Sequence, residues 1–409
     1  MHNGMAPSAQ ARKLTRLSTI HPYPAMIADE LAIALAHKYV TRGTRAFDPF
    51  SGTCRTLVAA AACGAECVGM DVNPLAVLVA RAKIINPSLK FDLFLKKSRG
   101  FRERLFEELD LQPGRKVVWF SQKACVELTQ IINWLNSESL PKDVRTLLAA
   151  ILSATTREVS YCRKDQWKLH RMSGERRKKY SISAWEVFDR RLRRAILELD
   201  SCEALPGKVR IQMGDSTRLS SLSRCVRGES FNLVLTSPPY GDSRSTVSYG
   251  DVSSLCLGVL QHLHGLNLPF ISSSNLDMRC LGGKYRANDY ERQDIGRYWA
   301  GGVYNPARRR VSVFLSDLNR SCVQTASVMD RKSKAIFVVS RRKVAGRRIY
   351  LDRFLSDVMG DLGFQSEGMQ RRRLEGKNTP YVINSGGSSG VTVRTQTMRE
   401  ELILSFSRS

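Results

Sequence analysis

The sequence predicts an α/β fold built on a mostly parallel sheet that helices cover. A strand pattern and a helix pattern alternate twice between residues 44 and 85. The alternation resumes with the apolar runs in KVRIQMGD and FNLVLTSPPY, and the chain closes on a strand, a helix and a last strand. Such alternation is typical of parallel sheets, because each helix carries the chain back across the sheet.

The early elements each have their own signal. Apolar residues recur every three or four positions between 24 and 40, which predicts a helix. A later helix stops at Gly64, and Pro74 stands in the first turn of the helix after it. In chain order, the expected elements are a helix over 24–40, a strand over 44–48, a helix over 56–64, a strand over 66–71 and a helix over 73–85.

The sequence from about residue 90 to 205 is helical and basic. In SISAWEVFDRRLRRAILEL, Ser183 and Glu186 have the spacing of a capping box, which predicts the start of a helix. The arginines of this helix fall largely outside its apolar stripe. The stripe that we expect to be buried consists of Trp185, Phe188, Leu192, Ile196 and Leu199.

The composition is strongly basic, with 64 Lys and Arg against 38 Asp and Glu and a formal net charge of +26. An excess of this size attracts polyanions, and nucleic acid is the partner that we expect.

No apolar run reaches the roughly 20 residues of a membrane span. The N-terminal segment lacks an apolar stretch of signal-peptide length, so we expect a protein of the cell interior. Ten cysteines without a CxxC pair disfavour a metal site.

The stretch FDPFSGTC predicts a ligand-binding loop. Asp48 ends the first strand, and small residues around Gly52 lead into a helix, so a ligand can approach the backbone closely. About twenty residues later, Asp71 ends the second strand, where a carboxylate can accept hydrogen bonds from ribose hydroxyls. Together these features predict a cofactor of the nucleoside type. The absence of a GxGxxG motif disfavours nicotinamide cofactors.

The step TSPPY ends another apolar strand and predicts a clamp for a flat ring with an exocyclic amine. Pro238 and Pro239 are stiff and have no N–H, so they present carbonyls only. The Ser237 side chain and the Pro238 carbonyl can accept hydrogen bonds from an N–H₂ group. Tyr240 supplies a face for stacking.

The chain resembles the S-adenosylmethionine-dependent DNA methyltransferases that modify exocyclic amines. The resemblance lies in HPYPAMIADEL, FDPFSGT, GMDVNPLAVLVARAK, GDSTRL and TSPPYGDSRSTVSYG, with KAIFVVSRR and EELILSF resembling the closing strands. The SPPY form is most typical of cytosine-N4 enzymes. The resemblance implies a Rossmann-like methyltransferase sheet, mostly parallel with a C-terminal antiparallel strand, with helices on both faces and helical, basic insertions.

The resemblance also implies roles for particular residues. Ser237, Pro238, Pro239 and Tyr240 would grip the flipped base. Cys54 departs from the family, because it stands where the FxGxG loop has its second glycine. The residues that would bind S-adenosylmethionine are Tyr23, Asp48, Phe50, Ser51, Gly52, Thr53, Asp71, Val72, Asn73, Asp215, Ser216 and Thr236.

The pattern divides the chain into a core and two insertions. Each insertion is a candidate for target recognition, and the sequence does not choose between them. We expect the N-terminal part of the methyltransferase domain with its cofactor loop over 1–89, a helical basic insertion over 90–205, the core with SPPY over 206–254, a second insertion over 255–332 and the C-terminal part of the core over 333–409.

The expected activity is site-specific transfer of a methyl group to the N4 amine of cytosine in double-stranded DNA, after the base is flipped out. Adenine-N6 methylation, methylation of an RNA amine and a non-catalytic DNA-binding role remain alternatives, and Cys54 favours the last. Carbon-5 methylation is excluded, since no Pro-Cys pair stands where SPPY does. The expected setting is the cytoplasm of a prokaryote or phage host. A restriction endonuclease acting on the same site is left open.

Overall fold

The computed structural model describes residues 20–24, 26–87, 119–164, 169–241, 249–283, 295–301, 307–373, 382–386, 392–396 and 400–409. The chain divides into two compact units. Among the described residues, unit 1 comprises those within 20–43, 51–213 and 247–277, and unit 2 comprises those within 44–50, 214–246 and 278–409.

The long strands form a mostly parallel sheet with the order β3-β2-β1-β4-β5-β11-β8. In unit 1, β2 runs parallel to β3; in unit 2, β1, β4 and β5 are parallel and β11 is antiparallel to both of its neighbours. The predicted fold class, including the antiparallel C-terminal strand, is confirmed. The strands are β1 (Arg45–Asp48), β2 (Glu66–Asp71), β3 (Lys208–Met213), β4 (Phe231–Thr236), β5 (Met329–Val339), β8 (Gln365–Arg373) and β11 (Glu400–Arg408).

The early helices of unit 1 are α2 (Asp29–Tyr39), α3 (Arg55–Ala62) and α4 (Pro74–Lys83). Two sequence signals are confirmed: Gly64 has a φ of +92° after α3, and Pro74 begins α4. The strand β2 has the predicted bounds. The helix expected from residue 24 begins instead at Asp29, because Pro24 lies in a turn at the end of a segment that tertiary contacts hold.

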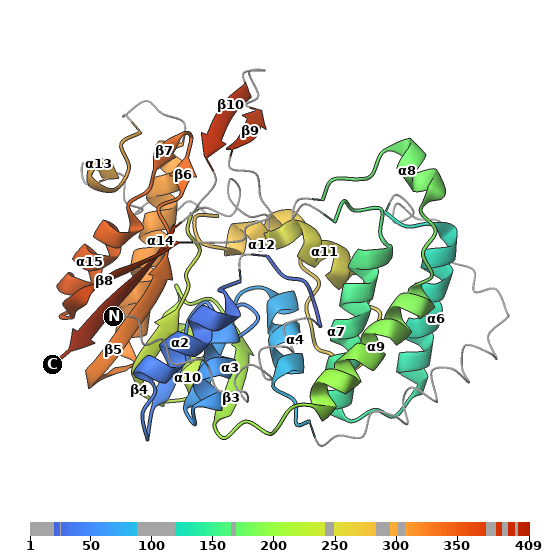
Figure 1. The fold of residues 1–409 in the computed structure, drawn as a ribbon, viewed down its shortest axis with the longest axis horizontal. Helices are drawn as coiled ribbons and strands as arrows, with labels where there is room; N and C mark the ends of the chain where they lie inside the picture. Colours follow the sequence, from blue (N-terminus) through green and yellow to red (C-terminus); the bar gives the residue numbers. More distant parts are fainter. Residues whose placement is uncertain are drawn as a thin grey trace. The chain divides into compact units, whose positions relative to one another are not determined.

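A helical layer in unit 1 is formed by α6 (Gln122–Ser137), α7 (Lys142–Val159), α9 (Ala184–Asp200) and α11 (Tyr249–Leu260) (Figure 1). These helices share one apolar core. At its centre the indole of Trp134 is fully buried and meets the ring of Phe188 edge-on at 6.1 Å. All five residues of the predicted apolar stripe of α9 are buried.

The start of α9 is capped by two groups. Ser183 Oγ accepts from the backbone N–H of Glu186 at 3.3 Å, as its spacing predicts. The carboxylate of Glu127, on α6, also accepts from the Ser183 hydroxyl at 2.7 Å and from the Ala184 N–H at 2.5 Å. A residue 56 positions away therefore satisfies donors that a local cap leaves open.

The remaining long helices lie in unit 2, where α15 packs against β8 and β11. The strand β8 had no signal in the sequence: nearly every residue is exposed, so its apolar residues do not alternate. No described helix is long and apolar enough to cross a membrane.

The further elements are α10 (Leu219–Val226), α14 (Arg308–Ser327), α15 (Leu351–Asp361), the short helices α8 (Gly174–Lys179), α12 (Ser273–Arg279) and α13 (Ile295–Tyr298), and the hairpins of β6 (Lys343–Val344) with β7 (Arg347–Arg348) and β9 (Val382–Gly386) with β10 (Thr392–Gln396).

Candidate functional site

The part of the site in unit 2 lies where β1 and β4 end side by side. The two strands are parallel, with Phe47 opposite Val234, so their carboxyl ends meet at the same edge. Asp48 is 2% exposed, and its Oδ1 accepts from the Thr236 hydroxyl at 2.5 Å and from the Phe50 N–H at 3.0 Å. One buried carboxylate oxygen therefore joins the start of the FDPFSGTC loop to the residue that precedes SPPY.

The SPPY step continues directly from β4. Pro238 is buried, while Ser237, Pro239 and Tyr240 are half-buried, so side chains of the step remain accessible. Ser237 Oγ lies 3.2 Å from the Tyr240 hydroxyl, within hydrogen-bond distance. When Ser237 donates to Tyr240, the lone pairs of its oxygen are free to accept from another group.

The part of the site in unit 1 begins with a tight turn from Ser51 to Cys54. The Cys54 N–H donates to the Ser51 carbonyl at 2.6 Å, and Gly52 and Cys54 have φ values of +49° and +57°. Both residues are therefore in the left-handed region, where a side chain is unfavourable. This explains why glycine suits the position of Cys54, which here is fully buried instead. Among the described residues, apart from the two chain neighbours of Gly52, no atom lies within 4 Å of where a Cβ on Gly52 would be.

Asp71 holds this turn from the end of β2. Its Oδ2 accepts from the Gly52 N–H at 2.9 Å, and its Oδ1 accepts from the Asn73 N–H at 2.8 Å. The side chains of Asp71 and Val72 are half-buried. Because a carboxylate oxygen can accept more than one hydrogen bond, Asp71 retains acceptor capacity toward a ligand.

Close packing brings the turn onto the strand. A Cβ on Gly69 would come within 2.8 Å of Ser51 Cβ and within 2.6 Å of the Leu57 side chain. Gly69 therefore lets the turn lie directly against β2. The sequence pattern gave no indication of this role for Gly69.

Asn73 connects three segments of unit 1 and is 1% exposed. Its Nδ2 donates to the Tyr23 hydroxyl at 2.9 Å and to Ser253 Oγ at 2.8 Å, while its Oδ1 caps α4 by accepting from the Leu75 N–H. The amide group of Asn73 is thus occupied within the protein. Its predicted contribution to cofactor binding stays a prediction, and its contact with Tyr23 fixes the position of that ring.

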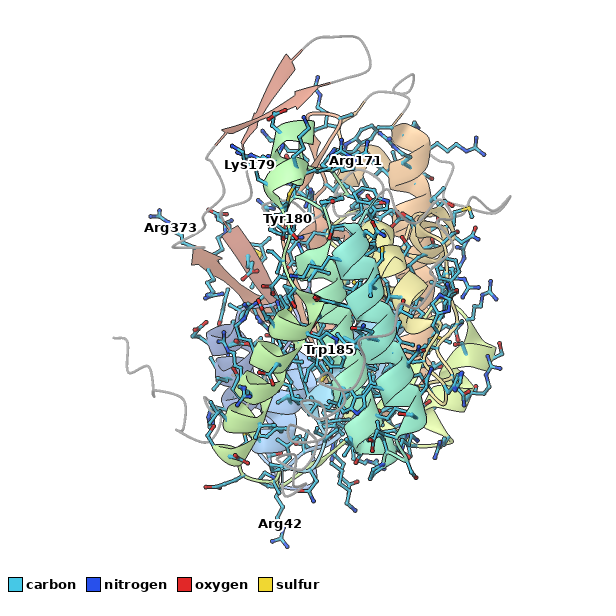
Figure 2. All side chains as sticks on the ribbon, turned by 90° about the vertical axis from the view of Figure 1, so that its right-hand side faces the viewer. Arg42, Arg171, Lys179, Tyr180, Trp185 and Arg373 are labelled. Atoms are coloured by element: carbon cyan, nitrogen blue, oxygen red, sulfur yellow. The ribbon has the colours of Figure 1, made fainter. Side chains whose placement is uncertain are left out.

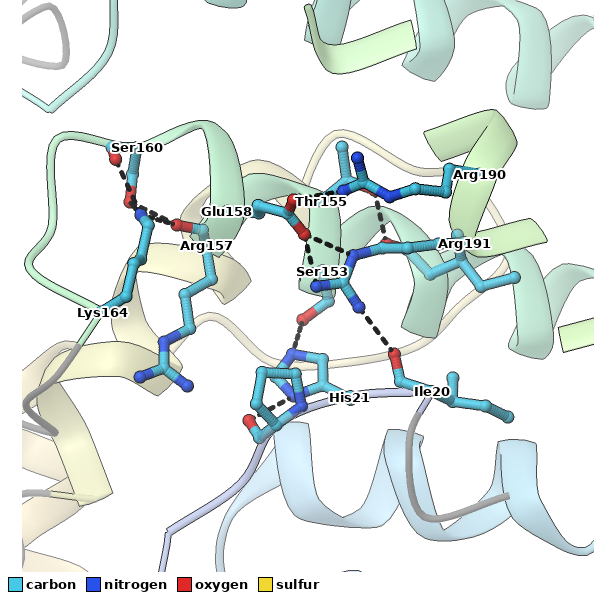
Figure 3. Close-up of polar contacts among 12 residues, drawn as sticks. Ile20, His21, Ser153, Thr155, Arg157, Glu158, Ser160, Lys164, Arg190 and Arg191 are labelled. Carbon is cyan, nitrogen blue, oxygen red and sulfur yellow. Dashed lines mark hydrogen bonds and ion pairs between the residues drawn. The ribbon is translucent and has the colours of Figure 1, made fainter. Parts of the chain in front are cut away.

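The segment that carries Tyr23 is fixed by a buried histidine (Figure 3). His21 Nδ1 donates to the Pro22 carbonyl at 2.8 Å, and Nε2 lies 2.8 Å from Ser153 Oγ on α7. Complete burial lowers the His21 pKa to about 3, so the ring is neutral and Nε2 accepts from the Ser153 hydroxyl. The guanidinium of Arg191, on α9, donates to the Ile20 carbonyl.

A buried lysine supports the turn from the other side. Lys83 Nζ donates to the Thr53 carbonyl at 3.1 Å and to Thr53 Oγ1 at 3.0 Å. Burial lowers the pKa of Lys83 to about 8. The sequence placed Lys83 on an apolar helix and gave no indication of this contact, since the partner is 30 positions away.

Asp215 and Ser216 lie in unit 2, just before α10. The Asp215 carboxylate accepts from Thr217 and pairs with Arg218, whose Nε is 3.1 Å from Oδ2. Ser216 is buried and its Oγ accepts from the Ser321 hydroxyl at 2.9 Å. These contacts fix the loop after β3, and the binding of S-adenosylmethionine that the resemblance implies for both residues stays a prediction.

The structure thus groups the predicted residues into clusters within each unit. In unit 1 the contacts join Tyr23, Gly52, Asp71 and Asn73. In unit 2 they join Asp48, Phe50 and Thr236, with SPPY next in the chain. The supporting residues that sequence reasoning missed are His21, Gly69, Lys83 and Ser253.

No family model matches the chain. The chain is 29% identical, over 92% of its length and 88% of the relative's, to the Type II methyltransferase M.MvaI of Kocuria varians. Solved structures that are similar include the rRNA methyltransferase aviRa from Streptomyces viridochromogenes (10% identity, TM-score 0.35, 97% of this chain and 92% of that one) and a SAM-dependent methyltransferase from Methanosarcina mazei (7%, 0.31, 95% and 98%). At these TM-scores, neither structure informs the function of this chain. The sequence similarity to the Type II enzyme supports a methyltransferase.

Proposed function

We propose that the chain is an S-adenosylmethionine-dependent DNA methyltransferase that acts on the N4 amine of cytosine. The observation that carries this proposal is the hydrogen bond between Asp48 and Thr236, which lies at the junction of the FDPFSGTC loop and the SPPY step. The similarity to a Type II methyltransferase along nearly the whole chain supports site-specific DNA methylation, and the choice of the cytosine amine rests on the SPPY step.

The residues in unit 1 fit a cofactor of the nucleoside type. Gly52 leaves open space above the turn, and the half-buried carboxylate of Asp71 can accept from ribose hydroxyls. Val72 offers an accessible apolar side chain next to Asp71. S-adenosylmethionine, when bound, supplies an electrophilic methyl group on a sulfonium. The role of the turn is to hold that cofactor in one orientation.

The SPPY step acts on the amine. Ser237 Oγ and the Pro238 carbonyl accept the two amine hydrogens, which localises the nitrogen lone pair for attack. Tyr240 stacks on the base. Its hydroxyl accepts a hydrogen bond from the Ser237 hydroxyl, so that the lone pairs of the serine oxygen point at the amine. The amine proton leaves after the methyl group has been transferred, so no strong base is required.

The basic excess supports duplex DNA as the substrate. A base inside a duplex is out of reach until it is flipped, which costs a few kcal/mol. Contacts from Lys and Arg to phosphates offset this cost and set the position of the protein on DNA. The net charge of +26 provides many such contacts.

The decisive experiment is to incubate the protein with unmethylated genomic DNA and labelled cofactor, digest the DNA to nucleosides and identify the methylated one by mass spectrometry. We expect N4-methylcytosine. N6-methyladenine would assign the same site to the other amine, and 5-methylcytosine would contradict the mechanism. Cofactor binding without any methylated nucleoside would instead support a non-catalytic DNA-binding role.

A further inference from the structure

The helical part of unit 1 contains two basic runs that look alike in the sequence. One is RRKK at 176–179, in α8, and the other is RRLRR at 190–194, in α9. Either could be a DNA-contacting surface or an ordinary solvated face. The contacts of the two runs differ sharply.

Every arginine of RRLRR meets a carboxylate. Arg190 and Arg191 share Glu158, as Figure 3 shows. Arg193 pairs with Asp189 at 2.8 Å and Arg194 pairs with Glu198 at 3.0 Å. Three carboxylates therefore offset most of the positive charge of these four arginines, and a phosphate would have to compete for each guanidinium.

The RRKK run is not balanced in this way. No residue of α8 is buried, and its one acid, Glu175, lies 3.6 Å from Lys178 with both side chains largely exposed. Arg176 and Lys179 are exposed. Among the described residues, neither side chain has a hydrogen-bond or ion-pair partner. The helix thus presents cations to solvent that the protein leaves uncompensated.

Although α8 is exposed, the segments on either side of it are firmly attached. Before α8, the Met172 N–H donates to the Tyr161 carbonyl at 2.8 Å, next to the fully buried Cys162. After α8, the Tyr180 hydroxyl donates to the Glu158 carbonyl at 2.5 Å. The Tyr161 and Tyr180 rings lie 6.3 Å apart, with the Arg177 guanidinium 6.0 Å from the Tyr161 ring centre. Figure 2 labels Lys179 and Tyr180 in this region.

This attachment has an energetic consequence. Six residues are too few for an isolated helix to be stable in water, and like charges on neighbouring turns weaken it further. The protein nevertheless holds four cations on one short helix. A bound polyanion removes the repulsion among them, and a fixed array of cations loses little conformational entropy when it binds.

We propose that α8, through Arg176, Lys178 and Lys179, contacts the phosphate backbone of duplex DNA, and that the RRLRR run does not. The proposal rests on the proposed function, because it assumes that duplex DNA is the substrate. It also assigns the first insertion, over 90–205, to DNA contact.

The test compares two double variants that each remove two charges. The first is Arg176→Gln with Lys179→Gln, and the matched control is Arg193→Gln with Arg194→Gln. Binding of a fluorescent 30-base-pair duplex is measured between 50 and 200 mM salt, together with cofactor binding. Each phosphate contact contributes about 0.9 to the slope of log affinity against log salt, so we expect the α8 variant to lose roughly 2 from this slope and to bind about tenfold more weakly at low salt.

The outcomes separate the two proposals. The control is expected to bind DNA as the unmodified protein does, and cofactor binding is expected to be unchanged in both variants. Equal DNA binding by the two variants, or weaker binding by the control, would overturn the role of α8. Single-stranded RNA is titrated in the same way, and an α8 variant that loses binding to RNA but not to duplex DNA would also overturn the proposal. If the unmodified protein binds DNA through α8 yet methylates no nucleoside, the surface stands and the enzymatic proposal fails.

Discussion

Asp48 and Asp71 stand at equivalent places, each at the carboxyl end of a strand, yet the two carboxylates have different roles. Asp48 is almost completely buried and uses one oxygen to hold Phe50 and Thr236 within unit 2. Asp71 is half-buried and holds two backbone N–H groups of unit 1 while part of it stays accessible. Burial confines Asp48 to contacts within the protein, whereas the half-buried carboxylate of Asp71 also meets solvent and fits the proposed cofactor contact.

The largest effects are expected in the SPPY step next to Asp48. Ser237→Ala removes an amine acceptor and should slow methyl transfer about 10²-fold, a typical loss for one positioned catalytic group. Tyr240→Ala removes the stacking face, which is worth about 1–3 kcal/mol per base. Single-turnover rates and DNA retention should be measured together, because retention should remain largely intact.

The matched control for the stacking role is Tyr240→Phe. It keeps the ring and loses only the hydroxyl that lies 3.2 Å from Ser237 Oγ. The rate should therefore fall far less than in Tyr240→Ala. Equal rates for Tyr240→Ala and the unmodified protein would refute stacking.

A stability difference should separate the two aspartates. Asp48→Ala leaves the Phe50 N–H and the Thr236 hydroxyl without this acceptor in a buried place, which should cost about 3 kcal/mol. Asp71→Ala should cost about 1 kcal/mol, since water can reach the half-buried site. Urea unfolding of both variants measures the difference, and a larger loss in Asp71→Ala would reverse our assignment.

Cofactor affinity should show the opposite order. A hydrogen bond to a charged group contributes about 1.5–3 kcal/mol, so Asp71→Ala should raise the Kd for S-adenosylmethionine about 10- to 100-fold. Calorimetric titration of the folded variant measures this directly. An unchanged Kd would remove Asp71 from the cofactor site and leave it with a role within the protein, such as its contacts to Gly52 and Asn73.

The last expected effect is a change of stability with pH, and it concerns the segment that carries Tyr23. The pKa of His21 is lowered to about 3 in the folded protein, whereas an unfolded histidine has a pKa near 6.5. Between these values the unfolded chain binds the proton, so stability should fall as the pH drops from 6.5 toward 3, by at most about 1.4 kcal/mol per pH unit from this group.

His21→Gln should remove this contribution to the pH dependence. Unfolding free energies of the variant and of the unmodified protein should therefore converge as the pH decreases through that window. The substitution His170→Gln, at an exposed histidine, is the control for the loss of an imidazole. A constant difference at all pH values would mean that His21 is not kept neutral by burial.

Local signals determined much of what the sequence predicts correctly. The bounds of β2, the stop at Gly64, the Pro74 start of α4 and the buried stripe of α9 depend on residues that are neighbours along the chain. The two site motifs were likewise readable, because the FDPFSGTC loop and SPPY each consist of consecutive residues.

Tertiary structure decided everything that depends on a distant partner. Glu127 caps α9, Lys83 holds Thr53, and Ser153 fixes His21 across 132 positions. A distant partner also explains why the sequence does not distinguish RRKK from RRLRR, because Glu158, which pairs with Arg190 and Arg191, lies more than 30 positions before them. Whether a cation is available to a phosphate depends on whether a carboxylate such as Glu158 has been folded against it, and only the three-dimensional arrangement sets that distance.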